Sequence, residues 1–322
     1  MQYVREFCNK LGVPVRQDVY GNLLATYSRG KTLSPVVFTS HMDHPGFEVV
    51  SVRGTLAKVC LLGGVNPKHF EKAKIIIYSA GKPLKGRVVK KTGKYFLVRT
   101  VKPVAPKNFG CFDLPACQFR NGRIYTKAAD NVMSVALLLN LLSTLSRKKT
   151  KTHALCLFTR AEEVGFIGAL GLIRNNFIPK QYPLVVLETS SAKAGKIKIG
   201  GGPALRVGDR WSTFSSELDV WFRETAGKSF QFQRALLPGG RCEASVYVTA
   251  GYQAGCLALP LGNYHNQGRK GPAAEYVSQS DYSLLLEWLE KLAVSPRPRS
   301  IGLQNQKLLQ KRFSKLKHRL TV

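Results

Sequence analysis

The stretch Thr159-Arg160-Ala161-Glu162-Glu163-Val164-Gly165-Phe166-Ile167-Gly168 places two neighbouring acids directly after an apolar run, residues 154–158. The apolar run predicts a buried strand, and carboxylates at the end of such a strand are costly to bury without a positive partner. Adjacent side chains on a strand diverge, so one carboxylate can bind a metal ion while the other addresses a water molecule. The stretch therefore predicts a hydrolytic site. The alternative is a solvated Glu162–Glu163 pair on a helix face.

Length and composition limit the class of protein. With 322 residues, 44% of them hydrophobic, the chain can bury a full core and is long enough for two domains. Its first ten residues lack the hydrophobic centre of a signal peptide, and we expect no membrane span and a cytoplasmic location. The seven cysteines are scattered without a CxxC pair, so neither a disulfide framework nor a cysteine zinc site is predicted.

The chain is strongly basic, with a formal net charge of +30. Such an excess is typical of proteins that meet nucleic acids or other anionic partners, although a generally basic proteome would give the same count. From Lys291 onward the sequence holds no acid, and Leu309, Phe313, Leu316 and Leu320 fall on one helical face of this tail. The basic tail is therefore a candidate segment for binding nucleic acid or another anionic partner. The alternative is a solvated end that packs on its own body.

Other side chains that can bind a metal ion also lie at the ends of predicted strands or helices. The run Val36 to Ser40 leads into His41-Met42-Asp43, and on a strand His41 and Asp43 share one face. Imidazole is a common zinc ligand, and a nearby carboxylate fixes its tautomer, although a lone His-x-Asp is more often a surface turn.

Three more residues extend this pattern. Asp130 precedes an apolar helix, residues 132–145, where an ordinary N-cap is the alternative to a metal ligand. Glu188 follows the strand predicted for residues 182–187, and His265 follows the strand predicted for residues 256–259. Since ligands collect at the carboxyl ends of strands in an open sheet, we expect these side chains to form one constellation.

Between residues 47 and 120 the sequence consists of short runs in which apolar and polar residues alternate, broken by glycine, lysine and proline. Such runs predict a small β-barrel or sandwich. We therefore divide the chain into a first catalytic part (1–46), an inserted β domain (47–120), a second catalytic part (121–293) and a basic tail (294–322). The predicted fold class is α/β, a three-layer domain with a central mixed sheet plus a small barrel-like insertion.

The motifs HMDHPGF, KAADN, RAEEVGFIGA, GGGPALRVGD, PGGRCEA and PLGNYHN occur in this order along most of the chain. Together they resemble the dinuclear metallo-aminopeptidases typified by the tetrahedral and glutamyl aminopeptidases, of the zinc-dependent exopeptidase clan. The resemblance implies a hydrolase that removes amino-terminal residues from peptides, a three-layer zinc-peptidase-like fold and two divalent metal ions, zinc or cobalt. It also implies assembly into a homo-oligomer through the inserted domain.

The resemblance further assigns roles to residues. Asp130 matches an aspartate shared by both metals; His41 and Glu188 match further ligands of one metal, and Glu163 and His265 match those of the other. Glu162 matches the general base that deprotonates a bridging water, and Asp43 matches the acid that supports His41 and this base. Glu188 stands where an aspartate is usual in the closest subfamily.

Two other functions stay open from the sequence. Glu243 is a candidate for holding the free amine of a peptide substrate, by its position alone. A deacylase or carboxypeptidase of the same clan would instead need an arginine that grips a substrate carboxylate, and Arg206 and Arg241 are the candidates. The third possibility is a catalytically reduced basic binding protein, against which the complete set of matched ligands argues.

Overall fold

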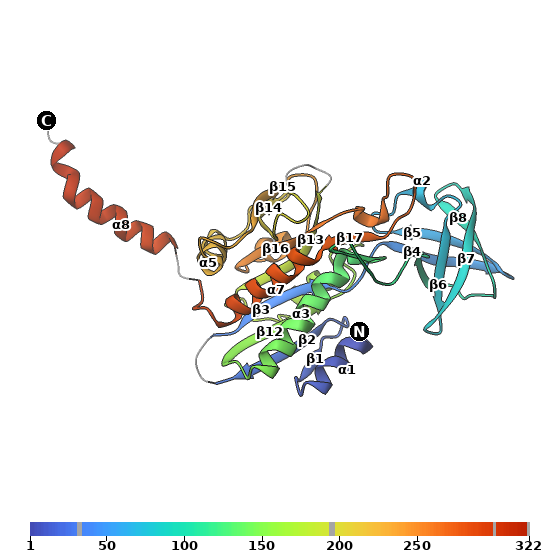
Figure 1. The fold of residues 1–322 in the computed structure, drawn as a ribbon, viewed down its shortest axis with the longest axis horizontal. Coiled ribbons are helices and arrows are strands. Elements are labelled where there is room, and N and C mark those ends of the chain that lie inside the picture. Colours follow the sequence, from blue (N-terminus) through green and yellow to red (C-terminus); the bar gives the residue numbers. More distant parts are fainter. Residues whose placement is uncertain (31–33, 193–196, 299–300, 321–322) are drawn as a thin grey trace.

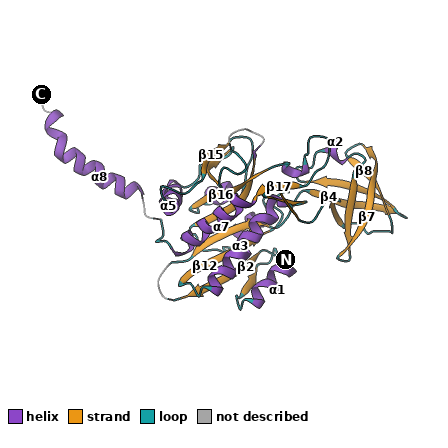
Figure 2. Cartoon of the chain, in the orientation of Figure 1, coloured by secondary structure: helices purple, strands orange, loops and turns teal. Residues whose placement is uncertain are grey.

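The structure is a computed structural model that describes residues 1–30, 34–192, 197–298 and 301–320. An eight-stranded mixed sheet forms its body, and a six-stranded barrel stands at one end (Figures 1 and 2). The sheet strands, in spatial order, are β1 (Val15–Gln17), β2 (Leu23–Arg29), β12 (Thr152–Thr159), β3 (Val36–His41), β13 (Leu184–Ser191), β16 (Ala254–Leu261), β14 (Ala204–Asp209) and β15 (Gln233–Leu237).

The four central strands β12, β3, β13 and β16 run parallel to one another. They are buried along almost their whole length, as expected for parallel strands that are covered on both faces. Because parallel strands end at the same edge of a sheet, the residues at their carboxyl ends are brought together. This edge carries the side chains considered below.

Helices cover both faces of the sheet and form two separate apolar cores with it. One face is covered by α1 (Gln2–Lys10), α3 (Ala129–Arg147), α5 (Ser216–Ala226) and α7 (Gln279–Val294). The other is covered by α4 (Ile167–Arg174) and α6 (Glu243–Thr249). The predicted three-layer α/β fold is therefore confirmed.

The barrel closes in the order β4 (Gly46–Arg53), β5 (Leu56–Leu62), β8 (Tyr95–Thr100), β7 (Lys82–Thr92), β6 (Lys74–Ser79) and β9 (Phe109–Phe112). Its interior is filled by aromatic and β-branched side chains, with Phe70 of the short helix α2 (Pro67–Phe70) packed edge-on against Phe47 and Phe96. The alternating runs of the sequence at residues 48–52, 57–62, 74–78, 85–89 and 95–101 all form barrel strands. The strand β9 was not predicted, and it is the one that closes the barrel.

The strands β10 (Gln118–Arg120) and β11 (Arg123–Thr126) follow the barrel in the chain and form a small antiparallel sheet with β17 (Glu275–Ser278). Within the described residues, one helix, α3, is long and apolar enough to cross a membrane by length and composition. However, 67% of its apolar window is buried inside the fold, where it packs against β3 and α7. Its apolar character is that of a core helix.

The tail forms a helix, α8 (Ile301–Leu316), and one further turn, η3 (Lys317–Leu320). Figure 1 shows α8 leading away from the body at the end opposite to the barrel. The described side chains from residue 304 to 320 are exposed, except for the half-buried Leu316, so this part of the tail does not pack on the body. Before the helix, Arg297 donates hydrogen bonds to the backbone carbonyls of Ser34 and His153.

Candidate metal centre

Five side chains meet at the carboxyl edge of the sheet, each from a different element. His41 is the last residue of β3, Glu188 lies in β13 and Asp130 lies at the start of α3. Glu163 follows β12, and His265 lies in the turn η2 (Tyr264–Asn266) after β16. All five side chains are at most 9% exposed.

Asp130 joins these residues into two groups. Its Oδ1 lies 3.5 Å from His41 Nε2, and its Oδ2 lies 3.6 Å from His265 Nε2. His41 Nε2 is also 3.6 Å from Glu188 Oε2, and His265 Nε2 is 3.4 Å from Glu163 Oε1. Each of these two groups of three can hold one metal ion.

The residues fit two ions of this kind. Two ligands of one tetrahedral zinc ion, each about 2.1 Å from it, lie about 3.4 Å apart, which matches the spacing of these nitrogen and oxygen atoms. Asp130 Oδ1, Glu188 Oε1 and His265 Nε2 are buried without a hydrogen-bond partner, which is costly unless a cation satisfies them. Mixed imidazole and carboxylate donors suit zinc and cobalt.

Asp130 does not cap α3, which was the alternative to a metal ligand. No side chain caps this helix, and Asp130 has a non-helical backbone (φ −80°, ψ 103°) that turns the carboxylate toward both histidines. Burial would raise the pKa of this carboxyl, but the His265 and His41 imidazoles outweigh burial and hold the pKa well below its usual range. The same carboxylate, with Glu163, raises the pKa of His265 to about 10 against the effect of burial.

Glu162 and Glu163 lie in a loop beyond β12, which ends at Thr159, so their predicted place at the end of the strand is corrected. Ala161 adopts a left-handed backbone (φ 56°) that ends the extended segment. The Asp43 carboxylate then accepts hydrogen bonds from the backbone N–H groups of both glutamates, each at 3.1 Å. Asp43 itself lies just beyond β3, not on it as expected, with Oδ1 3.7 Å from His41 Nδ1.

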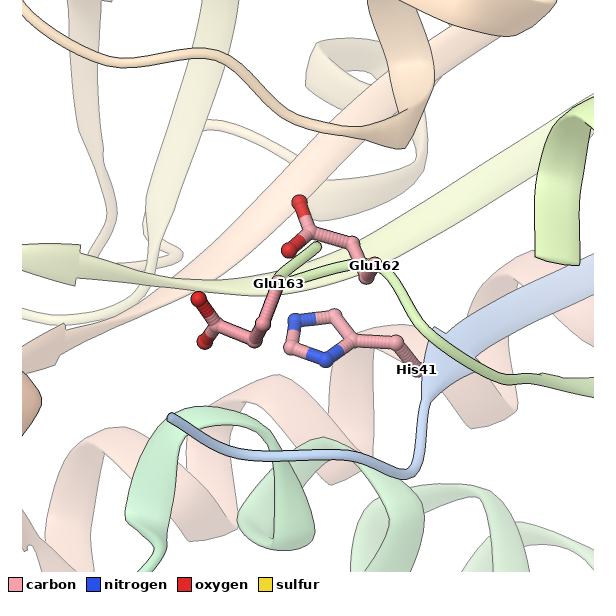
Figure 3. Close-up of side chains that lie close together, drawn as sticks. All are labelled: His41, Glu162 and Glu163. Carbon is pink, nitrogen blue, oxygen red and sulfur yellow. The ribbon is translucent and has the colours of Figure 1, made fainter. Parts of the chain in front are cut away.

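Figure 3 shows a ring nitrogen of His41 pointing between the two glutamate carboxylates, which come from a separate chain segment. The three side chains offer ligand atoms within 4.8 Å of one another. Burial raises the pKa of Glu162 well above its usual value, and the surrounding carboxylates raise it further while His41 opposes them. The pair is therefore not a solvated pair on a helix face.

Glu275, at the start of β17, was not predicted from the sequence. Its fully buried carboxylate accepts hydrogen bonds from the backbone N–H groups of Asp130, at 2.9 Å, and of His265, at 2.7 Å. His265 and its neighbours Asn263 and Asn266 all have left-handed backbones, with φ near 55°. This conformation is unfavourable for residues other than glycine, so the bond from His265 N–H to Glu275 helps to hold it.

The barrel also contacts the centre. The backbone carbonyl of Gly64, which follows β5, lies 3.3 Å from His265 Nδ1. A Cβ atom at Gly64 would lie 2.1 Å from that same nitrogen, so glycine alone fits against the ring. The His265 ring also stacks on the Tyr264 ring, with the ring centres 3.7 Å apart.

A cavity of about 560 Å³ opens beside the cluster. Its wall includes His41, Asp130, Glu162, Glu163 and Glu188, and continues over Phe166, Arg206, Leu237, Pro238, Arg241 and Tyr264. Arg206 is buried and donates to the Ser190 hydroxyl and the Thr189 carbonyl. Arg241 is exposed and lies 4.4 Å over the Trp211 ring.

Glu243 does not line this cavity. It is fully buried at the start of α6, where Oε2 accepts a hydrogen bond from the Thr159 hydroxyl at 2.9 Å. Burial raises its pKa to about 8. Glu243 is therefore not exposed to a substrate in the cavity.

Comparison with known proteins identifies relatives of this chain. The family model of the M42 glutamyl aminopeptidases matches residues 100–271. A putative aminopeptidase of Acetivibrio thermocellus is 24% identical over 271 residues, which are 78% of this chain and 81% of that protein.

Solved structures share the fold. An aminopeptidase of the archaeon Desulfurococcus kamchatkensis superposes with a TM-score of 0.79 at 19% identity, covering 92% of this chain and 89% of that one. The TET1 peptidase of Pyrococcus horikoshii superposes with a TM-score of 0.77 at 19% identity, covering 90% and 92%. Since the family model matches more than half of the 322 residues, the chain belongs to the M42 glutamyl aminopeptidase family and is a metallopeptidase of the exopeptidase class.

Proposed function

We propose that this chain is an aminopeptidase with a dinuclear metal centre, which hydrolyses the amino-terminal peptide bond of its substrate. The observation that carries the proposal is the pair of three-residue groups that share Asp130, at the wall of a cavity that also holds Glu162. One ion would be held by His41, Asp130 and Glu188. The other would be held by Asp130, Glu163 and His265.

Two zinc or cobalt ions bound there would supply Lewis-acid chemistry, acidifying a water molecule and polarising the scissile carbonyl. Glu162 is the proposed general base. It takes a proton from the attacking water and delivers it to the leaving amine, a role that suits a carboxylate with a raised pKa. Asp43 positions this base, because it holds the backbone N–H groups of both glutamates and also contacts His41.

The proposed substrate is a peptide with a free amino terminus. The sequence-based role of Glu243 as the amine anchor would require a rearrangement, because the residue is fully buried behind Thr159. We therefore assign it to the support of the centre. The carboxylates on the cavity wall, Asp130, Glu162, Glu163 and Glu188, are those proposed to hold the ions or to act as the base.

A second candidate function is that of a deacylase or carboxypeptidase, favoured by the two arginines on the cavity wall. The guanidinium of Arg206 is already engaged by Ser190 and Thr189, which leaves the exposed Arg241 as the cation for a substrate carboxylate. A deacylase would act on acylated amino acids that lack a free amine. The two functions therefore separate by substrate.

The test is release of the chromophore from aminoacyl chromogenic substrates and, in parallel, release of free amine from N-acetylated amino acids, which keep the carboxylate that a deacylase would bind. Protein stripped of metal and reloaded with zinc or cobalt is compared with Glu162→Gln treated in the same way. We expect release from the free-amine substrates only, dependent on metal, with kcat reduced about 10²- to 10⁴-fold in the variant. Two metal equivalents should still bind to the variant. Preferential hydrolysis of the acetylated series would replace the aminopeptidase by the deacylase.

We also propose that the chain forms a homo-oligomer in the cytoplasm. The TET1 peptidase of Pyrococcus horikoshii is described as assembling into a tetrahedron or a large octahedral shell, and it shares this fold. All seven cysteines of the present chain are free, as in proteins of reducing compartments. Light scattering coupled to size exclusion tests the assembly, and a monomer at micromolar concentration would contradict it.

A further inference from the structure

The inserted barrel carries a distribution of charge that the peptidase function does not use. Residues 46–112 contain fourteen lysines and arginines and two acids, whereas the whole chain contains 49 and 19. Between residues 72 and 112 there are eleven lysines and arginines and no acid. The barrel is therefore much more basic, relative to its acids, than the rest of an already basic chain.

The strand register places part of this charge in one row. Lys74 of β6 lies directly opposite Arg87 of β7, and Arg87 lies directly opposite Arg99 of β8. All three side chains are exposed on the outer face of the barrel. Like charges directly opposite each other on neighbouring strands destabilise a sheet.

Further cations lie on the same face. Lys85 and Lys90 of β7 pair with Ile76 and Leu97, and Lys58 of β5 also pairs with Leu97. The Lys58 ammonium lies 4.2 Å over the Tyr95 ring, its one described partner. We call the outer face formed by Lys58, Lys74, Lys85, Arg87, Lys90 and Arg99 the cationic face.

The described ion pairs of lysine and arginine with acidic side chains lie outside the barrel. In the described parts of the chain, lysine and arginine form ion pairs between Lys148 and Glu290, between Lys291 and Glu287, and from Arg223 and Arg234 to Asp219. None of these pairs involves a residue of the barrel, although every barrel residue is described. A general adaptation to a basic composition would not by itself concentrate unpaired cations in one row.

The positive charge of the cationic face favours some classes of binding partner over others. A second copy of this face would bring cations against cations, because a twofold interface places the same patch on both sides. Protein interfaces are depleted of lysine at their centres, whereas lysine and arginine together are the usual partners of phosphate groups. The strand spacing of about 4.8 Å sets a close ladder of cations suited to a chain of phosphates.

We propose that the cationic face of the barrel binds nucleic acid through its sugar–phosphate backbone, without reading its sequence. Binding is driven by release of counterions from the phosphates, so it weakens steeply with salt. This function is separate from the hydrolytic centre. It would hold the peptidase near ribonucleoprotein or other nucleic-acid assemblies.

The test uses full-length protein and a fluorescently labelled 20-nucleotide RNA, read by anisotropy across a series of salt concentrations. One variant neutralises the row with Lys74→Gln, Arg87→Gln and Arg99→Gln. The matched control neutralises three exposed lysines of α8, with Lys307→Gln, Lys311→Gln and Lys315→Gln. Both variants lose the same formal charge, but at opposite ends of the molecule (Figure 1).

We expect the barrel variant to bind about 10- to 100-fold more weakly near 0.1 M salt and to lose about two units of the salt slope. The α8 variant should bind within about twofold of wild type. Two RNAs of different sequence should bind equally to the wild-type protein. Equal losses in both variants, a loss confined to the α8 variant, or no binding by wild type would overturn the proposal.

Two controls keep the result interpretable. Aminopeptidase turnover of a neutral substrate reports on the fold of each variant, and a second barrel variant, Lys58→Gln with Lys85→Gln and Lys90→Gln, repeats the test with other members of the face. Polyglutamate added at equal charge is the competitor. Displacement of RNA by polyglutamate as effective as displacement by unlabelled RNA would assign the face to acidic proteins instead.

Discussion

Replacement of Glu275 by glutamine tests whether this buried carboxylate positions the metal ligands. The side chain accepts the backbone N–H groups of Asp130 and His265 with its two oxygens. Glutamine keeps one oxygen but presents an NH₂ group, which cannot accept, to the other N–H. One buried N–H group therefore loses its partner, at a cost of about 1 to 3 kcal/mol.

The lost hydrogen bond destabilises the backbone conformation that positions the metal ligands Asp130 and His265. His265 has an unfavourable left-handed backbone (φ 53°, ψ 40°), which the bond to Glu275 helps to hold. Partners that orient metal ligands contribute about 10- to 100-fold to metal affinity. We therefore expect Glu275→Gln to weaken binding at the position formed by Asp130, Glu163 and His265 by this factor.

The chain offers a matched control in Asp281. This carboxylate is also fully buried and also accepts two backbone N–H groups, those of Gly200 at 2.7 Å and Gly202 at 2.9 Å. Asp281→Asn should lower the free energy of unfolding by a similar amount and leave metal affinity unchanged. Calorimetric titration of stripped protein with zinc measures the affinity, and thermal unfolding measures the stability. Equal metal affinity in both variants, or wild-type affinity in Glu275→Gln, would refute the positioning role.

Three further predictions concern the same centre. Gly64→Ala should displace the His265 ring, because the new Cβ would lie 2.1 Å from Nδ1; we expect loss of one metal equivalent by mass spectrometry with the fold retained by circular dichroism. Burial raises the folded-state pKa of Glu243 to about 8, above its unfolded value near 4.5, so its contribution to stability is complete below pH 4.5 and is lost as the pH rises through 8. Metal-free wild type should therefore lose up to about 4 to 5 kcal/mol between these pH values in urea titrations, while Glu243→Gln should show a flatter profile. Zinc at about 100 times its dissociation constant should stabilise wild type by about 2.7 kcal/mol for each of the two ions, and a similar total gain in Asp130→Asn would contradict the shared role of Asp130.

The strand-end pattern was sufficient to predict which side chains meet. His41, Glu188 and His265 stand beside runs of apolar residues that become parallel strands, and such strands end at a common edge. The local backbone conformation around these side chains could not be predicted from the same pattern. The loop that carries Glu162 depends on the left-handed Ala161 and on capture of two N–H groups by Asp43, which is a contact over 119 residues of chain.

Glu275 and β9 were missed for related reasons. Glu275 does not follow an apolar run in the sequence. Its role depends on hydrogen bonds from backbone N–H groups, and such bonds cannot be predicted from the pattern of side chains. The one available signal was the presence of an acid in a chain that has few acids. β9 has only four residues and contains Gly110, so its alternation is too short to indicate a strand. The domain boundaries were drawn only from the change in residue pattern along the sequence, and they stay a prediction.

The contact between Gly64 and His265 joins the barrel to the hydrolytic centre. The barrel also begins at Gly46, five residues after His41, so the module is connected to a ligand of each proposed ion. Thermodynamic linkage then requires reciprocity: a ligand on the barrel that changes metal affinity by some factor must have its own affinity changed by metal by that same factor. Any effect of a barrel ligand on zinc affinity is thus matched by an equal effect of zinc on the affinity for that ligand.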